Sequence, residues 1–215
     1  MARGYDAGAD AFASWQRQIT GWNRQRRVEG LLALLPERPD VLELGSGAGV
    51  ESTRVLARQS DLTGIDISAE QVQRARERVP GARFLRADFT TIELEPARFD
   101  AVVSFYVLNH VPREELGPLL TRIAEWLRPG GYLLASFGAS DLPRWYGKAI
   151  GGLWTFFSGY EPDVTLRLVR SSGLEVVRVE LETIREPEGE ATFLWVLACK
   201  PGQEGSSRPR RTLEP

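Results

Sequence analysis

The nine residues Val41–Gly49, VLELGSGAG, decide the fold class of this 215-residue chain. A short apolar run that is typical of a buried strand leads directly into three glycines at alternate positions. Glycine lets the backbone turn sharply and approach a ligand without a Cβ clash, and a helix that follows such a turn offers free N–H groups. The stretch therefore predicts a strand, a tight turn and a helix, with a ligand bound at the turn.

Around this stretch, short apolar runs alternate with amphipathic segments through most of the sequence. The alternation is typical of βαβ units that build a parallel sheet with helices on both faces. The predicted class is therefore α/β, and the length suits one domain. The candidate strands are Val41–Leu44, Leu62–Ile65, Arg83–Leu85, Ala101–Phe105, Tyr132–Ser136, Leu174–Leu181 and Phe193–Ala198.

Two of the connecting helices carry clear signals. Ser68 followed by Gln71 indicates a capping box at the start of one helix. Apolar residues at helical spacing predict the other, and Pro129–Gly131 is expected to stop it before the next strand. The apolar residues are Val72, Ala75 and Val79 in the first helix and Leu116, Leu119, Leu120, Ile123 and Leu127 in the second.

Three further segments divide the chain. Residues 1–35 are predicted to form a cover of one or two helices, and residues 36–200 the main domain. Within that domain, residues 139–161 concentrate aromatic rings among glycines and predict a lid. Residues 201–215 are polar, lack an apolar period and predict a flexible tail.

The composition excludes several classes of partner. With 27 basic and 29 acidic residues the formal charge is −2, so there is no electrostatic case for a nucleic-acid partner. One cysteine, Cys199, and one histidine, His110, exclude a disulfide within the chain and a multi-histidine zinc site. Because no signal core or apolar run of about 20 residues occurs, we expect a cytoplasmic protein without a membrane partner or a metal. The oligomeric state cannot be derived from the sequence.

The spacing of the glycines distinguishes between two kinds of cofactor-binding motif. A dinucleotide fingerprint has the form GxGxxG, but Val50 stands where its third glycine would be, and Glu43 precedes the glycines by two positions. A pyrophosphate-binding turn is therefore the weaker interpretation. The stretch resembles the first motif of class I S-adenosylmethionine (SAM) dependent methyltransferases, E/D-x-G-x-G-x-G, which Glu43, Gly45, Gly47 and Gly49 match residue by residue.

The resemblance has consequences for fold and cofactor. It implies a single Rossmann-like domain with a seven-stranded, mostly parallel sheet and an antiparallel last strand pair. It also implies that the glycine loop, including Ser46, lies against the methionine part of SAM, while Glu43 orients the ammonium group of the cofactor. S-adenosylhomocysteine would be the product.

A carboxylate ends the second predicted strand. Leu62–Asp66 places Asp66 about twenty residues beyond the glycine turn, where ribose-binding acids occur in such folds. A carboxylate can accept hydrogen bonds from both ribose hydroxyls. We therefore predict that Asp66 binds the ribose and that Ile67 forms an apolar wall for the adenine.

Two later segments complete the predicted cofactor site. Phe84–Phe89 resembles the family segment after the third strand, which implies that Asp88 receives the adenine amino group and that Ala87 and Phe89 flank the ring. The fourth strand would bring two further residues, Ser104 and Phe105, to the carboxyl edge of the sheet beside the methionine moiety. The resemblance covers roughly residues 38–138 in register.

His110 is the candidate catalytic residue, because it follows the fourth strand where the family places its methyl-transfer pocket. A hydroxyl acceptor benefits from a base with a pKa near neutrality, and imidazole suits that role. Two other readings stay open: the histidine serves the scaffold, or the acceptor is an amine that only needs to arrive neutral and requires no base.

The acceptor side is predicted from aromatic residues. Six rings occur between Trp145 and Tyr160, which exceeds what a connection needs, and aromatic-lined pockets are typical of small-molecule sites. We expect a largely apolar or planar small-molecule acceptor enclosed by Trp145 and Tyr160, by Tyr106, and by Trp15 and Trp22 of the N-terminal cover. Ordinary lid packing is the alternative for any single ring.

Three other functions remain open. A nicotinamide-dependent oxidoreductase would use the same glycine turn but leave the later motifs unexplained. A non-catalytic SAM-binding protein would keep the cofactor site. An RNA or protein acceptor would keep the reaction, although the acidic balance and the sequence SFYV at residues 104–107, in place of Asn-Pro-Pro-aromatic, argue against RNA.

Overall fold

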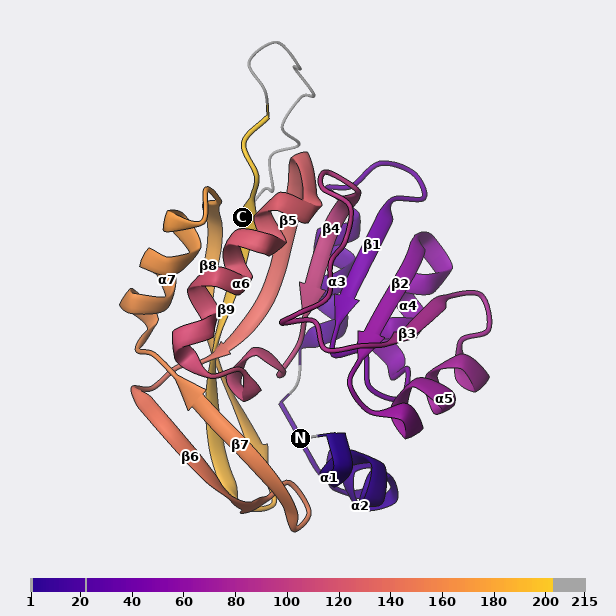
Figure 1. Ribbon diagram of the computed structural model, residues 1–215, viewed down its shortest axis with the longest axis vertical. Helices are drawn as coiled ribbons and strands as arrows, with labels where there is room; N and C mark the ends of the chain where they lie inside the picture. The colour runs from indigo at the N-terminus through magenta and orange to yellow at the C-terminus, as the bar shows by residue number, and fades with distance from the viewer. Residues whose placement is uncertain (1, 22, 203–215) are drawn as a thin grey trace.

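The computed structural model describes residues 2–21 and 23–202 and contains a central sheet with helices on both faces (Figure 1). The seven strands of the sheet are ordered β3-β2-β1-β4-β5-β9-β8. The first five in sequence run parallel to their neighbours, and β9 runs antiparallel to both β5 and β8. The strands are β1 Asp40–Leu44, β2 Asp61–Asp66, β3 Arg83–Arg86, β4 Phe99–Ser104, β5 Leu127–Gly138, β8 Glu175–Glu186 and β9 Gly189–Cys199. The predicted fold class is confirmed, and each of the seven candidate strands corresponds to one of these.

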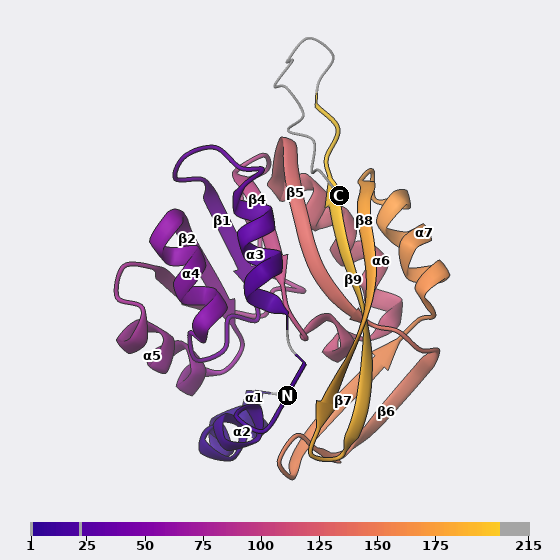
Figure 2. The ribbon, with the colours of Figure 1, turned by 180° about the vertical axis from the view of Figure 1, so that it is seen from behind.

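Helices cover both faces because successive residues of the central strands point to opposite sides. In β1, Val41 packs in the cluster beneath α3 (Arg24–Leu32) and α4 (Glu51–Gln59), while Leu42 packs in the cluster beneath α6 (Arg113–Trp126). Figures 1 and 2 show α6 and α7 (Pro162–Ser171) on one face of the sheet and α3 and α4 on the other. Strands buried on both sides explain the continuous apolar runs of the sequence.

Helix α5 (Ala69–Arg78) begins at the predicted capping residue. The Ser68 hydroxyl accepts a hydrogen bond from the Gln71 backbone N–H at 3.2 Å. The second half of a capping box is not formed, because the Gln71 side-chain oxygen has no hydrogen-bond partner among the described residues. This side chain lines a cavity instead.

The predicted end of α6 is wrong by a few residues. The helix ends at Trp126, and Leu127 is the first residue of β5, where it pairs with Phe99 of β4. Pro129–Gly131 therefore lies inside β5, at a register shift against β4, with Gly130 in a left-handed conformation at φ 80°. The prediction extended the helix to Leu127 because this residue, the first of β5, is fully buried and happens to continue the helical spacing of apolar residues.

The aromatic lid segment forms a β-hairpin that the sequence analysis did not predict. Its strands, β6 (Leu142–Ala149) and β7 (Leu153–Gly159), make a separate two-stranded antiparallel sheet. The hairpin lies at the carboxyl end of the parallel strands, next to the long ends of β8 and β9 (Figure 1).

The N-terminal cover divides into two parts with different surroundings. Helices α1 (Ala2–Ala7) and α2 (Ala9–Gln16) lie at the carboxyl end of the sheet, whereas α3 packs on its face as part of the core. No helix within residues 2–21 and 23–202 is long and apolar enough to cross a membrane. Most of the predicted tail, residues 203–215, lies outside the described residues.

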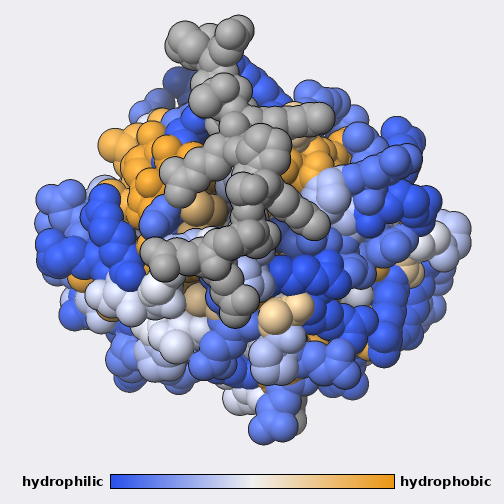
Figure 3. All heavy atoms as spheres, turned by 90° about the horizontal axis from the view of Figure 1, so that it is seen from above, coloured by the Kyte–Doolittle hydropathy of each residue, from blue (hydrophilic) through white to orange (hydrophobic). Residues whose placement is uncertain are grey.

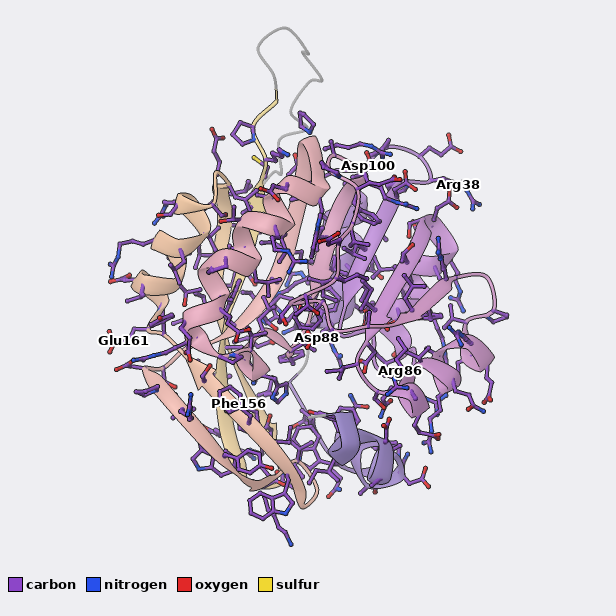
Figure 4. All side chains as sticks on the ribbon, viewed as in Figure 1. Arg38, Arg86, Asp88, Asp100, Phe156 and Glu161 are labelled. Atoms are coloured by element: carbon purple, nitrogen blue, oxygen red, sulfur yellow. The ribbon has the colours of Figure 1, made fainter. Side chains whose placement is uncertain are left out.

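The opposite end of the sheet is held by ion pairs. Arg128 binds Asp40 at 2.7 Å and Asp100 at 2.6 Å, which ties the starts of β1, β4 and β5 together. Arg38 pairs with Asp61 nearby, and Figure 4 labels Arg38 and Asp100 at this end. Figure 3 looks onto it and shows a mainly hydrophilic surface with hydrophobic areas beside the grey residues. The ligand-binding features therefore lie at the carboxyl end.

Candidate functional site

A cavity of about 810 Å³ opens at the carboxyl ends of the parallel strands, between the glycine turn, α1–α2, the β6–β7 hairpin and the ends of β8 and β9. Ligands of open parallel sheets bind at this edge. Twelve of the residues predicted for the site line the cavity: Trp15, Glu43, Gly45, Ser46, Gly47, Asp66, Ile67, Asp88, Phe89, Phe105, Tyr106 and His110.

The three glycines of the turn have left-handed backbones, with φ of 71°, 53° and 68° at Gly45, Gly47 and Gly49. A Cβ at Gly45 would collide with the Val107 side chain at 2.4 Å, whereas a Cβ at Gly47 would meet nothing within 4 Å. Gly49 does not line the cavity: a Cβ there would press on Ala75 of α5 at 3.2 Å. Gly45 and Gly47 therefore shape the ligand surface, and Gly49 allows α5 to pack against the turn.

Glu43 places a carboxylate beneath the turn. It is 3% exposed, and its Oε1 accepts a hydrogen bond from the Thr53 hydroxyl at 3.0 Å. Its Oε2 has no hydrogen-bond partner within the described part of the chain. Burial raises the pKa of Glu43 to about 8, although Thr53 and the charge of Arg24 oppose the shift. An unpartnered buried oxygen is costly, so a cationic donor from a ligand fits this position.

Asp66 connects the turn to α5. One carboxylate oxygen accepts from the Gly47 N–H and the other from the Ser68 N–H, both at 2.9 Å. Burial raises the pKa of Asp66, and these two hydrogen bonds oppose the shift. Each carboxylate oxygen has a second acceptor site, so the group retains capacity for two hydroxyl donors.

The segment after β3 borders the other end of the cavity. Asp88 and Phe89 line it, and Figure 4 shows Asp88 near the carboxyl ends of the central strands. One oxygen of Asp88 accepts from the N–H and hydroxyl of Thr90, at 2.9 and 2.7 Å, which fixes the carboxylate. Ala87 does not line the cavity, and its N–H donates to the Asp66 carbonyl at 3.0 Å.

Buried polar atoms that the sequence analysis missed also face this cavity. Gln71 is 2% exposed and lines the cavity with an unpartnered Oε1. Asn109 lines it as well, and its Oδ1 lacks a partner among the described residues. The hydroxyl of Ser46, a predicted site residue, also lacks one. A capping-box reading assigned Gln71 to the helix start, so nothing in the sequence indicated that its amide faces a ligand.

The end of β4 turns sharply into the cavity. Ser104 is fully buried, and its hydroxyl donates to the Leu44 carbonyl at 3.3 Å, so it supports the strand and does not line the cavity. Phe105 and Tyr106 do. Tyr106 has a left-handed backbone at φ 59°, held by its N–H, which donates to the Ser136 hydroxyl at 2.6 Å. This strained residue directs its ring toward β8 and β9.

Glu182 of β8 is a second buried acid that the sequence analysis missed. It is 6% exposed and accepts hydrogen bonds from the Tyr106 hydroxyl at 2.5 Å, Trp195 Nε1 at 2.7 Å and Arg27 at 2.6 Å. Burial alone would raise the pKa of Glu182, but these hydrogen bonds and the Arg27 charge lower it. The Arg27 guanidinium also lies over the Trp195 ring at 4.3 Å. Glu182 therefore fixes Tyr106 against the wall of the cavity.

His110 ends the short 3₁₀ helix η1 (Leu108–His110). Its Nδ1 lies 2.8 Å from the Phe156 carbonyl, and its Nε2 lies 3.3 Å from the Tyr5 hydroxyl. Because a carbonyl can only accept, Nδ1 carries the hydrogen of the neutral ring and Nε2 accepts from Tyr5. Burial lowers the pKa of His110 to about 4, although the Phe156 contact opposes the shift. The ring also packs on Phe157 at 4.8 Å between centroids.

Helices α1 and α2 are attached over the cavity by polar contacts. Asp6 accepts from the Ser68 hydroxyl at 2.5 Å, and Asp10 pairs with Arg74 of α5 at 2.8 Å. On the other side, Trp15 Nε1 donates to Glu188 at 2.7 Å, in the turn between β8 and β9. The N-terminal helices therefore span the opening of the cavity between α5 and the β8–β9 turn.

Two rings predicted for the acceptor side lie outside the cavity. Trp145 is 39% exposed and packs on the outer side of Phe157, at 5.6 Å between centroids. Tyr160 packs against the core, with Arg113 over its ring at 4.9 Å. Phe157, the cross-strand partner of Trp145 on the same face of the hairpin, lines the cavity instead. The predicted contribution of Trp22 lies outside the described residues.

Within residues 2–21 and 23–202, no group of three or more His, Cys, Asp or Glu side chains is placed to hold a metal ion. The polar groups of the cavity are instead separate carboxylates and amides, spaced along the strand ends. Such an arrangement suits an extended organic ligand with several hydrogen-bonding groups.

Comparison with known proteins assigns the family. A family model described as a methyltransferase domain matches residues 41–131. An uncharacterised methyltransferase of Mycobacterium tuberculosis is 38% identical over 116 residues, which are 52% of this chain and 58% of that protein. Residues 41–131 form a methyltransferase domain of the class I SAM-dependent type. The resemblance seen in the sequence is therefore confirmed, and the nicotinamide alternative is not supported. The chain spans less than two thirds of the length of that relative.

Two further proteins resemble the chain over most of its length. A dTDP-3-amino-3,4,6-trideoxy-α-D-glucopyranose N,N-dimethyltransferase of Streptomyces venezuelae is 30% identical over 163 residues, 75% of this chain and 61% of that protein. A solved structure, the 1,6-didemethyltoxoflavin-N1-methyltransferase of Burkholderia thailandensis with bound 1,6-didemethyltoxoflavin and S-adenosylhomocysteine, has a TM-score of 0.63 at 21% identity, covering 94% of this chain and 91% of that one. The second match shows the shared fold.

Proposed function

We propose that this chain transfers a methyl group from SAM to an oxygen or nitrogen of a small, largely apolar or aromatic acceptor. The observation that carries the proposal is one continuous cavity of about 810 Å³. Carboxylates line its inner part at the glycine turn. Its outer part is lined mostly by aromatic and aliphatic side chains, together with Glu186 and Glu190 at the ends of β8 and β9. The Streptomyces venezuelae relative and the Burkholderia thailandensis structure are both named as methyltransferases of small molecules, which supports a small-molecule acceptor.

The inner part fits the cofactor group by group. Glu43 would face the ammonium of the methionine part, Asp66 the ribose hydroxyls and Asp88 the adenine amino group, because each is an acceptor opposite a donor. The unpartnered Glu43 oxygen and the open space over Gly47 support this fit. When bound, SAM supplies an electrophilic methyl carbon on a positively charged sulfur. Ile67 and Phe89 would enclose the adenine.

The outer part of the cavity aligns the acceptor and excludes water. Its walls come from α2, the β6–β7 hairpin and the ends of β8 and β9, and include Phe12, Trp15, Ile19, Ile150, Phe157, Ile184 and Phe193. In an in-line substitution, most of the rate comes from holding the nucleophile in position and removing its water shell. An apolar wall of this kind therefore favours a flat or hydrocarbon-rich acceptor.

We assign His110 an orienting role toward the acceptor. A pKa near 4 makes the imidazole a weak base at neutral pH. Its Nε2 nevertheless presents a lone pair, because Nδ1–H is held by the Phe156 carbonyl. An acceptor hydroxyl or amine could replace the Tyr5 hydroxyl at Nε2 and be held there by a hydrogen bond. Asn109 beside it offers a second polar contact.

The direct test measures S-adenosylhomocysteine release after SAM is added together with a panel of phenols, aromatic amines, fatty acids and amino sugars. We expect turnover with at least one aromatic or apolar member, and its loss in Asp66→Ala, a variant that should no longer bind the ribose. If the wild-type chain binds SAM but transfers methyl to no member, the non-catalytic alternative gains support. Turnover only with RNA or protein would contradict the proposed acceptor class.

A further inference from the structure

The edge of the sheet formed by β8 exposes apolar side chains that have no role in the proposed function. Strand β8 is the last in the strand order, and among the strands of residues 2–21 and 23–202 its sheet neighbour is β9, on one side only. Three of its side chains are large, hydrophobic and exposed: Val177 at 47%, Val179 at 41% and Leu181 at 64%. Sheet edges normally avoid exposed apolar runs, because the unpaired backbone groups of an edge strand invite pairing with another chain.

The bridge between Thr20 and Arg185 shows which backbone N–H and carbonyl groups of β8 point away from β9. Thr20 forms an isolated antiparallel bridge with Arg185, whose N–H and carbonyl bond Thr20 at 3.1 and 3.2 Å on the side away from β9. Because this direction alternates along a strand, Val179 and Leu181 also present their N–H and carbonyl groups outward. Thr20 covers only the C-terminal end of the β8 edge, at Arg185. The exposed apolar side chains lie on the N-terminal side of Arg185 and are not covered by Thr20.

We propose that this edge pairs with the same edge of a second copy of the chain, as antiparallel β8 strands related by a two-fold axis at Val179. In this register Val179 pairs with the partner's Val179, where outward backbone groups meet outward backbone groups as an antiparallel ladder requires. Leu181 lies opposite the partner's Val177, which is the extra residue of a β-bulge between Val176 and Arg178, so the regular ladder is short and ends at this position. The proposal depends only on β8 and is independent of the proposed function.

Charge complementarity selects this register over its neighbours. Centring the pair at Val179 places Arg178 opposite the partner's Glu180, and the two-fold axis repeats this opposite-charge pair. Shifting the centre to Glu180 places Glu180 opposite itself, and shifting it to Leu181 places Glu180 opposite the partner's Glu182. Like charges directly opposite each other in a sheet are unfavourable. The strand is therefore complementary to itself in one register, which identifies a second copy as the partner.

The test is the molar mass of the full chain by sedimentation velocity and light scattering across a range of protein concentrations. We expect a concentration-dependent dimer. Arg178→Glu should weaken its association at least about tenfold, because two like-charge pairs replace two opposite-charge pairs. The double variant Arg178→Glu/Glu180→Arg restores opposite charges and should recover the dimer. Arg58→Glu, an exposed α4 residue with the same charge change, is the matched control and should leave the dimer intact.

Folding is monitored separately, because Glu180 also pairs with Arg27 inside the chain at 2.9 Å. Arg178→Glu leaves that ion pair in place, so its thermal unfolding midpoint should stay near that of the wild type. A monomer at every concentration would overturn the proposal. So would a dimer that is equally strong in Arg178→Glu, since that result would place the interface elsewhere.

Discussion

The Tyr5 hydroxyl lies 3.3 Å from Nε2 of His110, which joins α1 to η1 across 105 positions of sequence. The contact brings a residue of the N-terminal cover to the nitrogen that the proposed mechanism offers to the acceptor. Because the Phe156 carbonyl is hydrogen-bonded to Nδ1, the methyl acceptor and the Tyr5 hydroxyl would compete for Nε2. The N-terminal helices therefore form part of the site itself.

This competition predicts opposite effects for two variants. Tyr5→Phe removes the competing hydroxyl, so the acceptor KM should fall about two- to fivefold, the equivalent of one hydrogen bond. His110→Gln removes the orienting lone pair, and kcat should fall about tenfold or more. Steady-state kinetics with an identified acceptor measures both changes. S-adenosylhomocysteine affinity should stay within about twofold in each, and unchanged turnover in His110→Gln would show that the histidine serves only the scaffold.

The pKa of His110 also predicts how stability depends on pH. The native pKa of about 4 lies below the unfolded value of 6.5, so the unfolded chain takes up a proton first as the pH falls. This residue should have no effect above pH 6.5 and should destabilise the native state progressively between pH 6.5 and 4, by about 3 kcal/mol at the lower limit.

Urea unfolding of the wild type and His110→Gln at pH 7 and pH 4.5 measures this effect, because the difference between the two proteins isolates the histidine. The stability of the wild type should fall relative to the variant at the lower pH. A constant difference at both pH values would indicate that the ring is protonated in the native state.

Glu43 predicts proton release when the cofactor binds. With a pKa of about 8, this carboxyl is mostly protonated at pH 7 in the free protein, whereas facing an ammonium group favours the ionised form. Binding at pH 7 should therefore release nearly one proton, and affinity should rise as the pH approaches 8.

Calorimetry of S-adenosylhomocysteine binding in two buffers of different ionisation enthalpy measures that proton. Glu43→Gln should remove the buffer dependence and weaken binding about tenfold, because a charge-assisted hydrogen bond is lost. Identical heats in both buffers for the wild type would contradict the assigned role.

Gln71 is predicted to contact the cofactor. Its buried Oε1 has no partner among the described residues and its side chain lines the cavity, so Gln71→Leu should weaken S-adenosylhomocysteine binding about fivefold and leave kcat unchanged. Gln73→Leu, an exposed position on the same helix, is the control and should bind normally. Equal affinities of the wild type and Gln71→Leu would show that the amide faces only water.

Replacing the buried carboxylate of Glu182 by an amide should lower the free energy of unfolding more than the same change at an exposed carboxylate. Glu182→Gln leaves the Arg27 charge without its buried partner, so the free energy of unfolding should fall by about 3 kcal/mol in urea titration. Glu180→Gln removes the half-exposed partner of the same arginine and should cost less than about 1 kcal/mol. Equal losses in the two variants would contradict the central position of Glu182.

The residues at the glycine-turn end of the cavity were predictable from sequence because they are local. Glu43, Gly45 and Gly47 share one strand and turn, and Asp66 ends the next strand, so periodicity alone brings them to one edge. Asp88 follows the third strand in the same way. The order of such strand ends along the chain reproduces their order in the sheet, which is why so little tertiary information was needed.

The acceptor side was not predictable, because its contacts join distant segments. Tyr5 meets His110, and Trp15 meets Glu188, through packing that no local period records. The pairing of Trp145 with Phe157 in the β6–β7 hairpin puts both rings on one face, and no local period shows which of the two reaches the cavity. Trp145 was assigned to the cavity, but Phe157 lines it.

The central claim, that the Glu43–Asp66 edge holds SAM, is tested most directly by isothermal calorimetry of the purified chain with S-adenosylhomocysteine and with NAD. We predict saturable one-to-one binding of S-adenosylhomocysteine, at least tenfold weaker in Asp66→Ala with the fold retained by circular dichroism, and no binding of NAD. Binding of NAD in preference to S-adenosylhomocysteine, or undiminished S-adenosylhomocysteine affinity in Asp66→Ala, would contradict it.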